Sequence, residues 1–271
     1  MVLVDRQRLK PRRRDDLIRL GKPRDGGYVV PAQAVACSEV LLSLGMKQDW
    51  SFERRFAAVN PATRVIGVDP SIGAALFARQ IVTSAGNLAI GALRREGRRV
   101  RRHATVLRTS LDYFWFFRWR HRHVARLVSA SDADGHIGFD ELFALARPTG
   151  DHRVFVKMDI EGSEYAVIGD LLRHERHINC VVIEFHRLAK RAGLFNEAVA
   201  RLQHGFQIVH IHGNNYAPYD AGNDFPDAVE ITLLNRALAT EPETESPGVY
   251  PRVGLDFPNT AARDDYPLRF E

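Results

Sequence analysis

The sequence has little cysteine and lacks any long apolar run. Only Cys37 and Cys180 occur in 271 residues, and they match no metal-binding spacing, so we expect two buried free thiols rather than a disulfide or a metal centre. No stretch reaches the roughly 18 apolar residues of a membrane helix. The first residues, MVLVDRQRLKPRRRDD, place apolar before basic residues, the reverse of a secretory signal. We therefore predict a cytoplasmic protein without a membrane span.

Glycine-rich nucleotide motifs are missing as well. Only Gly45 occurs in the loop SLGMKQDWSFE, whereas the turn that cradles a pyrophosphate needs three glycines at fixed spacing. Dinucleotide binding is therefore not predicted. Internal repeats are also missing, and low complexity is confined to the acidic stretch TEPETESPG near residue 240.

What is present is the composition of one globular α/β domain. Hydrophobic residues make up 45% and charged residues 26% of the chain, and this length can bury one sizeable core. Short β-rich runs alternate with helical patterns, which is typical of parallel βαβ units in a Rossmann-like, doubly wound sheet. We predict seven strands, at 39–44, 64–69, 104–108, 153–158, 178–185, 206–212 and 228–235. We expect a single domain with an N-terminal elaboration over 1–37, a core over 38–236 and an extended tail over 237–271.

Basic residues are concentrated in three places. The net charge of +5 arises mostly from 12–14, 94–102 and 118–126. The run RREGRRVRR predicts a basic helical face, and DYFWFFRWRHRH mixes aromatic rings with Arg and His, as a surface for phosphates and stacked bases would. A solvated arginine face beside an apolar anchor explains the same pattern. We favour that interpretation, so nucleic acid is not the expected partner.

Doubly wound sheets bind ligands beyond the carboxyl ends of their strands. Asp69 ends the second predicted strand, 24 residues after Gly45. This is close to the spacing at which an acidic residue meets an adenosine ribose. Helix capping by Asp-Pro-Ser is the alternative, and we favour ribose binding.

The segment VFVKMDIEGSEYAVI is the most specific feature of the chain. Asp159 and Glu161 follow a buried strand, Gly162 permits a tight turn, and Glu164 begins a helix, where its charge suits the positive end of the helix dipole. Capping explains Glu164 but leaves Asp159 and Glu161 unexplained. These two carboxylates are therefore candidate functional groups.

Histidines and a further carboxylate end the next two predicted strands. VVIEFHR contributes Glu184 and His186 to one side of its strand, and IVHIHGNNY contributes His210 and His212 to one side of the other. A lone histidine is usually a packed core residue, but several beside carboxylates at one sheet edge indicate a polar pocket with a general base. A metal site is the less favoured alternative, and no metal is predicted.

An EF-hand-like loop occurs in ASDADGHIGFDEL. Asp132, Asp134, Gly135, Ile137 and Glu141 match positions of a calcium loop, but Ala130 occupies the first ligand position. We therefore predict a turn leading into a helix over FDELFALA. A calcium-responsive interaction module is the alternative.

The chain resembles the FkbM-like branch of class I S-adenosylmethionine-dependent methyltransferases. The matching segments are RLGKPRDGGYVVP, LLSLGMKQDWSFE, VIGVDPS, VKMDIEGSEYAVI, VVIEFH, HIHGNNY and YPRVGLDFPN. They span most of the chain except 80–130. The resemblance implies a seven-stranded sheet that is mostly parallel with an antiparallel last strand. It also implies O-methylation of a hydroxyl on a sugar, glycan or related small metabolite.

The resemblance further implies a distribution of roles. Gly45 would lie under the methionine part of S-adenosylmethionine, Asp69 on its ribose and Asp159 near its methyl group. The full predicted cofactor-binding set is Ser43, Gly45, Asp49, Asp69, Pro70 and Asp159. The loop after the first strand departs from the glycine-rich motif usual in class I enzymes.

The expected chemistry needs a proton acceptor beside an activated methyl group. His186 is our first choice for the base, because imidazole titrates near neutrality, and Asp159 is the second. Glu184 completes the predicted catalytic set. The acceptor would be oriented by Glu161, His212, Asn214 and Asn215. The rival hypothesis is a catalytically inactive protein of the same fold with a basic nucleic-acid-binding surface.

Overall fold

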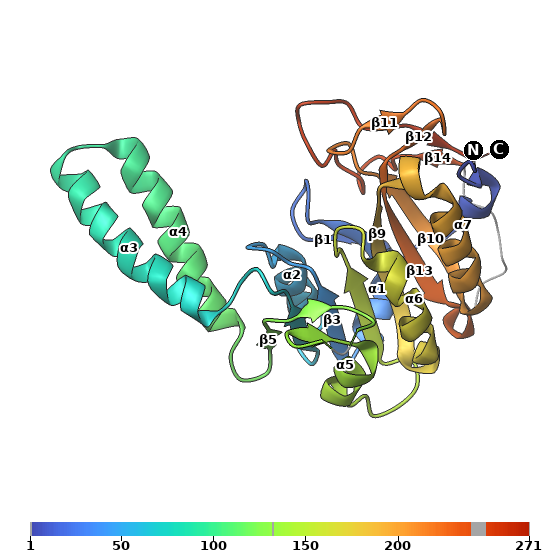
Figure 1. The fold of residues 1–271 in the computed structure, drawn as a ribbon, viewed down its shortest axis with the longest axis horizontal. Coiled ribbons are helices and arrows are strands. Elements are labelled where there is room, and N and C mark those ends of the chain that lie inside the picture. The colour runs from blue at the N-terminus through green and yellow to red at the C-terminus, as the bar shows by residue number, and fades with distance from the viewer. Residues whose placement is uncertain (1, 132, 240–247, 271) are drawn as a thin grey trace.

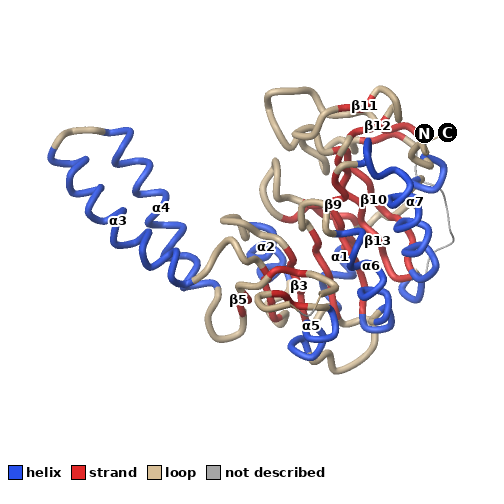
Figure 2. Tube along the Cα trace, viewed as in Figure 1, coloured by secondary structure: helices blue, strands red, loops and turns tan. Residues whose placement is uncertain are grey.

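A computed structural model describes residues 2–131, 133–239 and 248–270. A seven-stranded sheet runs through the centre of the body with helices on both faces (Figures 1 and 2). The strand order is β10-β13-β9-β8-β3-β4-β5. In chain order these strands are β3 (Val40–Leu44), β4 (Arg64–Val68), β5 (Arg122–Val124), β8 (Val154–Met158), β9 (Ile178–His186), β10 (Phe206–Gly213) and β13 (Ala228–Asn235).

The sheet confirms the predicted fold class. Strands β5, β4, β3, β8 and β9 pair in parallel. The last strand, β13, lies antiparallel between β9 and β10. The chain order reverses between β3 and β8, so the carboxyl ends of these two strands diverge to helices on opposite faces. This is where a ligand cleft forms in doubly wound sheets.

Alternating side chains build two hydrophobic cores. Val40, Leu42 and Leu44 pack in the core under α5 (Phe139–Ala146), α6 (Glu164–Arg173) and α7 (Leu188–Gly205). Leu41 packs in the opposite core with α1 (Ala32–Cys37) and α2 (Ser51–Val59). Because both faces are covered, the central strands are mostly apolar, as is usual for buried parallel strands, and Ser43 and Lys157 are the polar residues of β3 and β8.

The strand predicted at 104–108 is wrong. Residues 104–108 lie inside α4 (Gly97–Phe116), which pairs with α3 (Ala74–Leu93) in a helical hairpin that projects from the body (Figure 1). The edge position beside β4 is taken by β5 instead. The run ATVLR contains two β-branched residues that suggest a strand, but local propensity is weak and is overridden by the helix around it.

Short elements complete the chain around the sheet. The described residues form the pairs β1 (Leu17–Leu20) with β2 (Tyr28–Pro31), β6 (Leu127–Val128) with β7 (His136–Ile137), β11 (Tyr219–Asp220) with β12 (Phe225–Pro226), and β14 (Val249–Tyr250) with β15 (Leu268–Arg269). Three 3-10 turns are η1 (Arg6–Leu9), η2 (Glu175–His177) and η3 (Arg236–Leu238). Within the described residues, none of the helices combines the length and hydrophobicity that a bilayer span requires.

Three smaller expectations concern segments outside the central sheet. The helix predicted over FDELFALA is confirmed as α5, and Glu141 forms an ion pair with Arg126. Asp132 of the EF-hand-like loop and residues 240–247 of the acidic stretch lie outside the described residues. Both cysteines are free thiols, as predicted. Cys180 is buried, whereas Cys37, at the end of α1, is only half-buried.

Candidate functional site

A cavity of about 280 Å³ opens at the carboxyl ends of β3, β4 and β8. Of the predicted cofactor-binding residues, Gly45, Asp49, Asp69, Pro70 and Asp159 line it, and so does the predicted acceptor residue Glu161. Ser43 is not among the lining residues; it is fully buried beneath the cavity floor. The other lining residues include Asp25, Phe52, Glu53 and Lys157.

Gly45 is required by the backbone geometry at the end of β3. Its φ angle is +77°, and a Cβ atom placed there would lie 1.8 Å from the carbonyl oxygen of Asp159. The Gly45 amide donates to the Val68 carbonyl, and the Asp159 amide donates to the Leu44 carbonyl. Only glycine therefore allows β3 and β8 to approach this closely where they meet the cavity.

Asp69 organises the loop after β3. One carboxylate oxygen accepts from the backbone amides of Met46 and Lys47, at 2.8 and 2.6 Å, and the other accepts from the Ser71 amide and hydroxyl. Burial alone would raise the pKa of Asp69, but the bonds from Ser71, Lys47 and Met46 outweigh it and lower that pKa. A fixed anion therefore lines the cavity, and a ligand hydroxyl would bond to it by replacing the rotatable Ser71 hydroxyl as donor.

Glu53, on the first turn of α2, is a buried carboxylate that the sequence reasoning missed. Its Oε1 accepts the Ser43 hydroxyl hydrogen, and the Lys157 ammonium lies 3.8 Å away. Its Oε2 is buried without a hydrogen-bond partner, and burial raises the pKa of Glu53 against the opposing effects of Lys157 and Ser43. An unpaired buried carboxylate oxygen is costly, so Glu53 is a candidate partner for a cationic group of a ligand.

Lys157 is the second missed residue. It is buried, donates to the Gly45 carbonyl at 2.6 Å and lies over the Tyr28 ring. Lys157 could have been predicted as a site residue. It precedes Asp159 by two positions, and strand side chains alternate with period 2, so both are expected on the same side of the strand. Glu53 gave no such signal, since it comes from a helix ten residues beyond Ser43.

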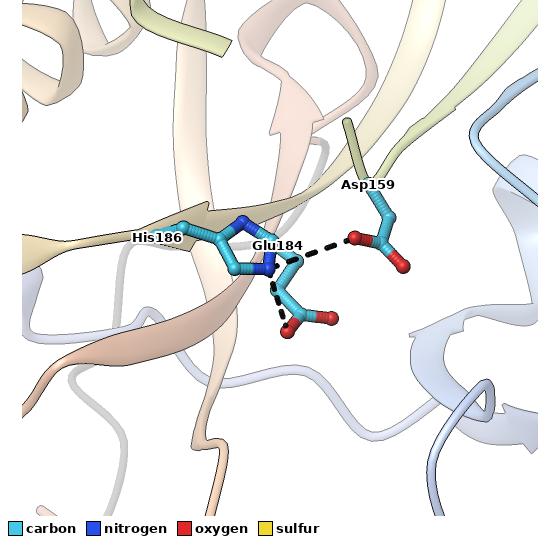
Figure 3. Close-up of side chains that lie close together, drawn as sticks. All are labelled: Asp159, Glu184 and His186. Atoms are coloured by element: carbon cyan, nitrogen blue, oxygen red, sulfur yellow. Dashed lines mark ion pairs between the residues drawn. The ribbon is translucent and has the colours of Figure 1, made fainter. Parts of the chain in front are cut away.

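Three predicted catalytic residues meet beside the cavity (Figure 3). Nε2 of His186 lies 3.3 Å from Glu184 Oε1 and 3.7 Å from Asp159 Oδ1. The Tyr28 hydroxyl lies 3.3 Å from Glu184 and 3.4 Å from Asp159. Neighbouring strands β8 and β9 thus deliver these groups to one place, and Tyr28 bridges the two carboxylates.

The surroundings of His186 favour its charged form. Nδ1 lies 3.0 Å from the buried carboxylate of Glu164, while Nε2 faces Asp159, Glu184 and, at 3.8 Å, Glu161. Burial opposes protonation, but the bonds to Glu164 and Glu184 outweigh it and raise the pKa of His186 to about 11. A protonated imidazole cannot accept a proton, so this environment argues against our first choice of base.

The carboxylates of Asp159 and Glu184 are therefore the candidate proton acceptors. Burial and the charge of Asp159 raise the pKa of Glu184 to about 7, against the lowering effect of His186. Burial also raises the pKa of Asp159, against Lys157 and His186. Asn214 donates to Glu184 Oε1 at 2.6 Å, so its amide holds this carboxylate in place.

His212 and Asn215 do not line the cavity. The His212 ring is buried between Glu230, at 3.3 Å, and Asp265 of the tail, at 3.0 Å. These contacts outweigh burial and raise the pKa of His212 to about 10. Asn215 bonds to the backbone of Thr260 and Arg263. Both predicted substrate residues therefore fasten the C-terminal tail to the sheet edge.

Two further lining carboxylates, Glu161 and Asp49, form ion pairs at the cavity rim. Glu161 forms an ion pair with Lys47, and Asp49 pairs with Lys22 at 2.7 Å. Asp49 also accepts from the Ser51 amide at the start of α2. Both side chains are partly exposed, so they are accessible to a ligand that enters the cavity.

The same cluster has the donor set for one divalent cation. Single ligand atoms of Asp159, Glu184 and His186 all lie within 4.8 Å of one another. Glu164 orients His186 through Nδ1, as carboxylates do for metal-bound imidazoles. A proton on His186 would supply one positive charge beside the same carboxylates, and it is the alternative to a metal here.

Comparisons with known proteins concern the fold. No family model matches the chain, and no curated protein matches its sequence. A putative caffeoyl-CoA O-methyltransferase from Staphylococcus aureus is 8% identical with a TM-score of 0.39, covering 75% of this chain and 80% of that chain. An O-methyltransferase from Bacillus cereus in complex with SAH is 10% identical with a TM-score of 0.36, covering 74% and 76%. Precorrin-6y C5,15-methyltransferase from Geobacter metallireducens is 13% identical with a TM-score of 0.36, covering 76% and 87%. The resemblance to the FkbM-like branch stays a prediction.

Proposed function

We propose that the protein is an S-adenosylmethionine-dependent methyltransferase that methylates a hydroxyl of a sugar, glycan or related small metabolite. The observation that carries this proposal is the cavity at the ends of β3, β4 and β8, which combines a fixed anion at Asp69 with an unpaired buried carboxylate at Glu53. A ligand with a vicinal diol at one end and an ammonium group at the other satisfies both. S-adenosylmethionine has these two groups.

The lining residues fit the parts of this cofactor. Asp69 would accept from a ribose hydroxyl in place of the Ser71 hydroxyl, and Gly45 allows the Asp159 backbone to lie close to the end of β3. Glu53 accepts from the α-ammonium group, while the neighbouring Lys157 ammonium suits the α-carboxylate. When bound, S-adenosylmethionine supplies a methyl carbon that is already electrophilic.

The chain must then align the acceptor hydroxyl and take its proton. Asp159 lines the cavity and is hydrogen-bonded through Tyr28 to Glu184. Because the pKa values of both carboxylates are raised, this pair holds a proton acceptor whose strength is matched to neutral pH. His186, charged, stabilises the pair and limits the rise of its pKa.

Asp69→Ala should weaken S-adenosylmethionine binding by roughly 10- to 100-fold, because it deletes charge-assisted bonds to the ribose. Isothermal titration calorimetry measures the change, and a thermal melt records the separate cost of freeing the Met46–Lys47 amides. Ser71→Ala is the control, since it removes one donor to Asp69 but leaves the carboxylate; its affinity should stay within about threefold. Unchanged affinity in Asp69→Ala would remove this residue from the site.

Glu53→Gln should weaken binding by roughly tenfold, because the neutral amide loses the charge-assisted bond to the α-ammonium. Glutamine keeps an acceptor for the Ser43 hydroxyl, so the fold should persist. The measurement is calorimetry with S-adenosylmethionine and with adenosine, which lacks the amino-acid group. Adenosine affinity should not change; an equal loss for both ligands contradicts the assignment of Glu53. The exposed Glu197→Gln serves as the matched control.

A further inference from the structure

The helical hairpin is a rigid projection with no role in the proposed chemistry. Residues 74–120, here called the arm, comprise α3, α4 and the turn that follows, and they extend away from the body (Figure 1). Each helix has 20 residues, or about 30 Å of length. Aromatic packing fixes the root, where Phe77 stacks on Tyr113 and both contact Trp50. The arm is therefore held out from the body as a defined surface.

The positive charge of the chain lies on this arm. It has ten arginines and two carboxylates, a net charge of +8, so the rest of the chain carries −3 of the total of +5. The two carboxylates are engaged, Glu96 with Arg99 and Asp112 with Arg54 and the Trp50 indole. Arg98, Arg101 and Arg102 are exposed, and no ion pair among the described residues includes them. The arm is suited to a polyanionic partner.

The arm also has its apolar side chains on the outside. Beyond the root, the fully buried described residues of the two helices are Ser84, Gly91 and Ser110. Large apolar groups are exposed instead: Val82, Leu93, Leu111, Phe114, Trp115 and Trp119. Soluble proteins rarely expose such a group of side chains without a partner.

Apolar and basic groups lie side by side along one groove. A shallow depression of about 680 Å³ is lined by Leu88, Leu107, Leu111 and Trp115 together with Arg108 and Arg118. The Arg118 guanidinium lies 3.4 Å from the centre of the Trp115 ring. Arginine beside tryptophan and leucine is the composition of helices that lie in the interface of an anionic membrane.

We propose that the arm docks on the surface of a lipid bilayer that contains anionic headgroups. Arginines would meet the headgroups, and the exposed leucine, valine and tryptophan side chains would enter the boundary of the acyl chains. Nucleic acid would use the arginines and aromatic rings but gains nothing from Val82, Leu93 and Leu111. A second copy of the arm is not the expected partner, because two arms that each carry +8 repel one another. This inference goes beyond the proposed function and does not depend on it.

Vesicle sedimentation tests the proposal on the full chain. Phosphatidylcholine vesicles with one quarter phosphatidylglycerol should bind roughly tenfold more protein than phosphatidylcholine alone, and added salt should weaken this binding. Tryptophan emission should shift to shorter wavelength, because Trp115 and Trp119 are exposed in the free protein whereas Trp50 is already buried. Absence of binding to the anionic vesicles overturns the proposal.

Paired variants separate insertion from charge alone. Leu111→Ser with Trp115→Ser should lower binding to anionic vesicles by roughly tenfold, whereas Leu194→Ser with Val253→Ser, exposed apolar residues elsewhere, should leave it within about twofold. Both variants should melt like the parent, since all four side chains are exposed. Equal binding of both variants to the anionic vesicles would contradict the insertion of Leu111 and Trp115 into the bilayer. Two other outcomes would overturn the choice of a membrane as the partner. One is salt-sensitive retention of single-stranded RNA without vesicle binding. The other is a doubled mass in light scattering that the Leu111/Trp115 variant abolishes.

Discussion

Asp159→Asn is expected to lower turnover by roughly 10² to 10⁴ while leaving S-adenosylmethionine affinity within a few-fold. Asparagine keeps the size of the side chain and an acceptor for the Tyr28 hydroxyl, but it cannot take a proton. The measurement combines calorimetry of cofactor binding with single-turnover methylation of an acceptor hydroxyl. Normal turnover with normal affinity would exclude Asp159 as the acceptor of the proton.

The pH profile distinguishes this carboxylate pair from His186. A base works only when unprotonated, so the rate should rise with pH through the pKa of the pair, about 7 at Glu184. His186 lowers the pKa of Glu184 by its hydrogen bond and charge. His186→Gln should therefore move the rising limb to higher pH. If His186 were itself the base, the same variant would lose that limb instead.

A chelator control addresses the cation alternative at the same cluster. Dialysis against EDTA should leave turnover unchanged if a proton on His186, and no metal ion, supplies the positive charge beside Asp159 and Glu184. Loss of activity that Mg²⁺ or Mn²⁺ restores would assign these residues as metal ligands and contradict the proton-based account.

Gly45→Ala should lower the free energy of unfolding by on the order of 3 to 5 kcal/mol, because the new methyl group would overlap the Asp159 carbonyl and the backbone is left-handed there. In a chain of this size, this corresponds to a fall in melting temperature of roughly 6 to 15 °C. Thermal unfolding followed by circular dichroism measures it and needs no ligand.

Gly86→Ala is the matched control for this substitution. Gly86 lies within α3, and an added Cβ would meet nothing within 4 Å. Alanine should therefore raise stability by about 0.4 to 1 kcal/mol. A melting temperature for Gly45→Ala equal to that of the parent would contradict the close approach of β3 and β8.

The site residues that could be predicted from sequence are those placed by strand periodicity. Asp69, Asp159, Glu184 and His186 end or follow apolar runs, so their arrival at one sheet edge follows from the parallel pairing of β4, β8 and β9 with their neighbours. Glu53 could not be found this way, because it reaches the cavity from the side through α2. Asn214 also ends a strand and followed the pattern. Its hydrogen bond to Glu184, however, is visible only in the fold.

The α/β class, six of the seven central strands and the edge of the sheet where chemistry was expected could all be predicted from the sequence. These features follow from hydrophobic periodicity and from the polar residues that end each run, which are local properties. Only the folded chain shows that Glu164 and Glu184 lie beside His186 and raise its pKa, and that His212 and Asn215 bond to the tail. It also shows that residues 104–108 join a projecting helix. These outcomes depend on groups far apart in the chain, such as Glu164 beside His186 and Asp265 beside His212, and charge, burial and pairing between distant residues are set only when the chain has folded.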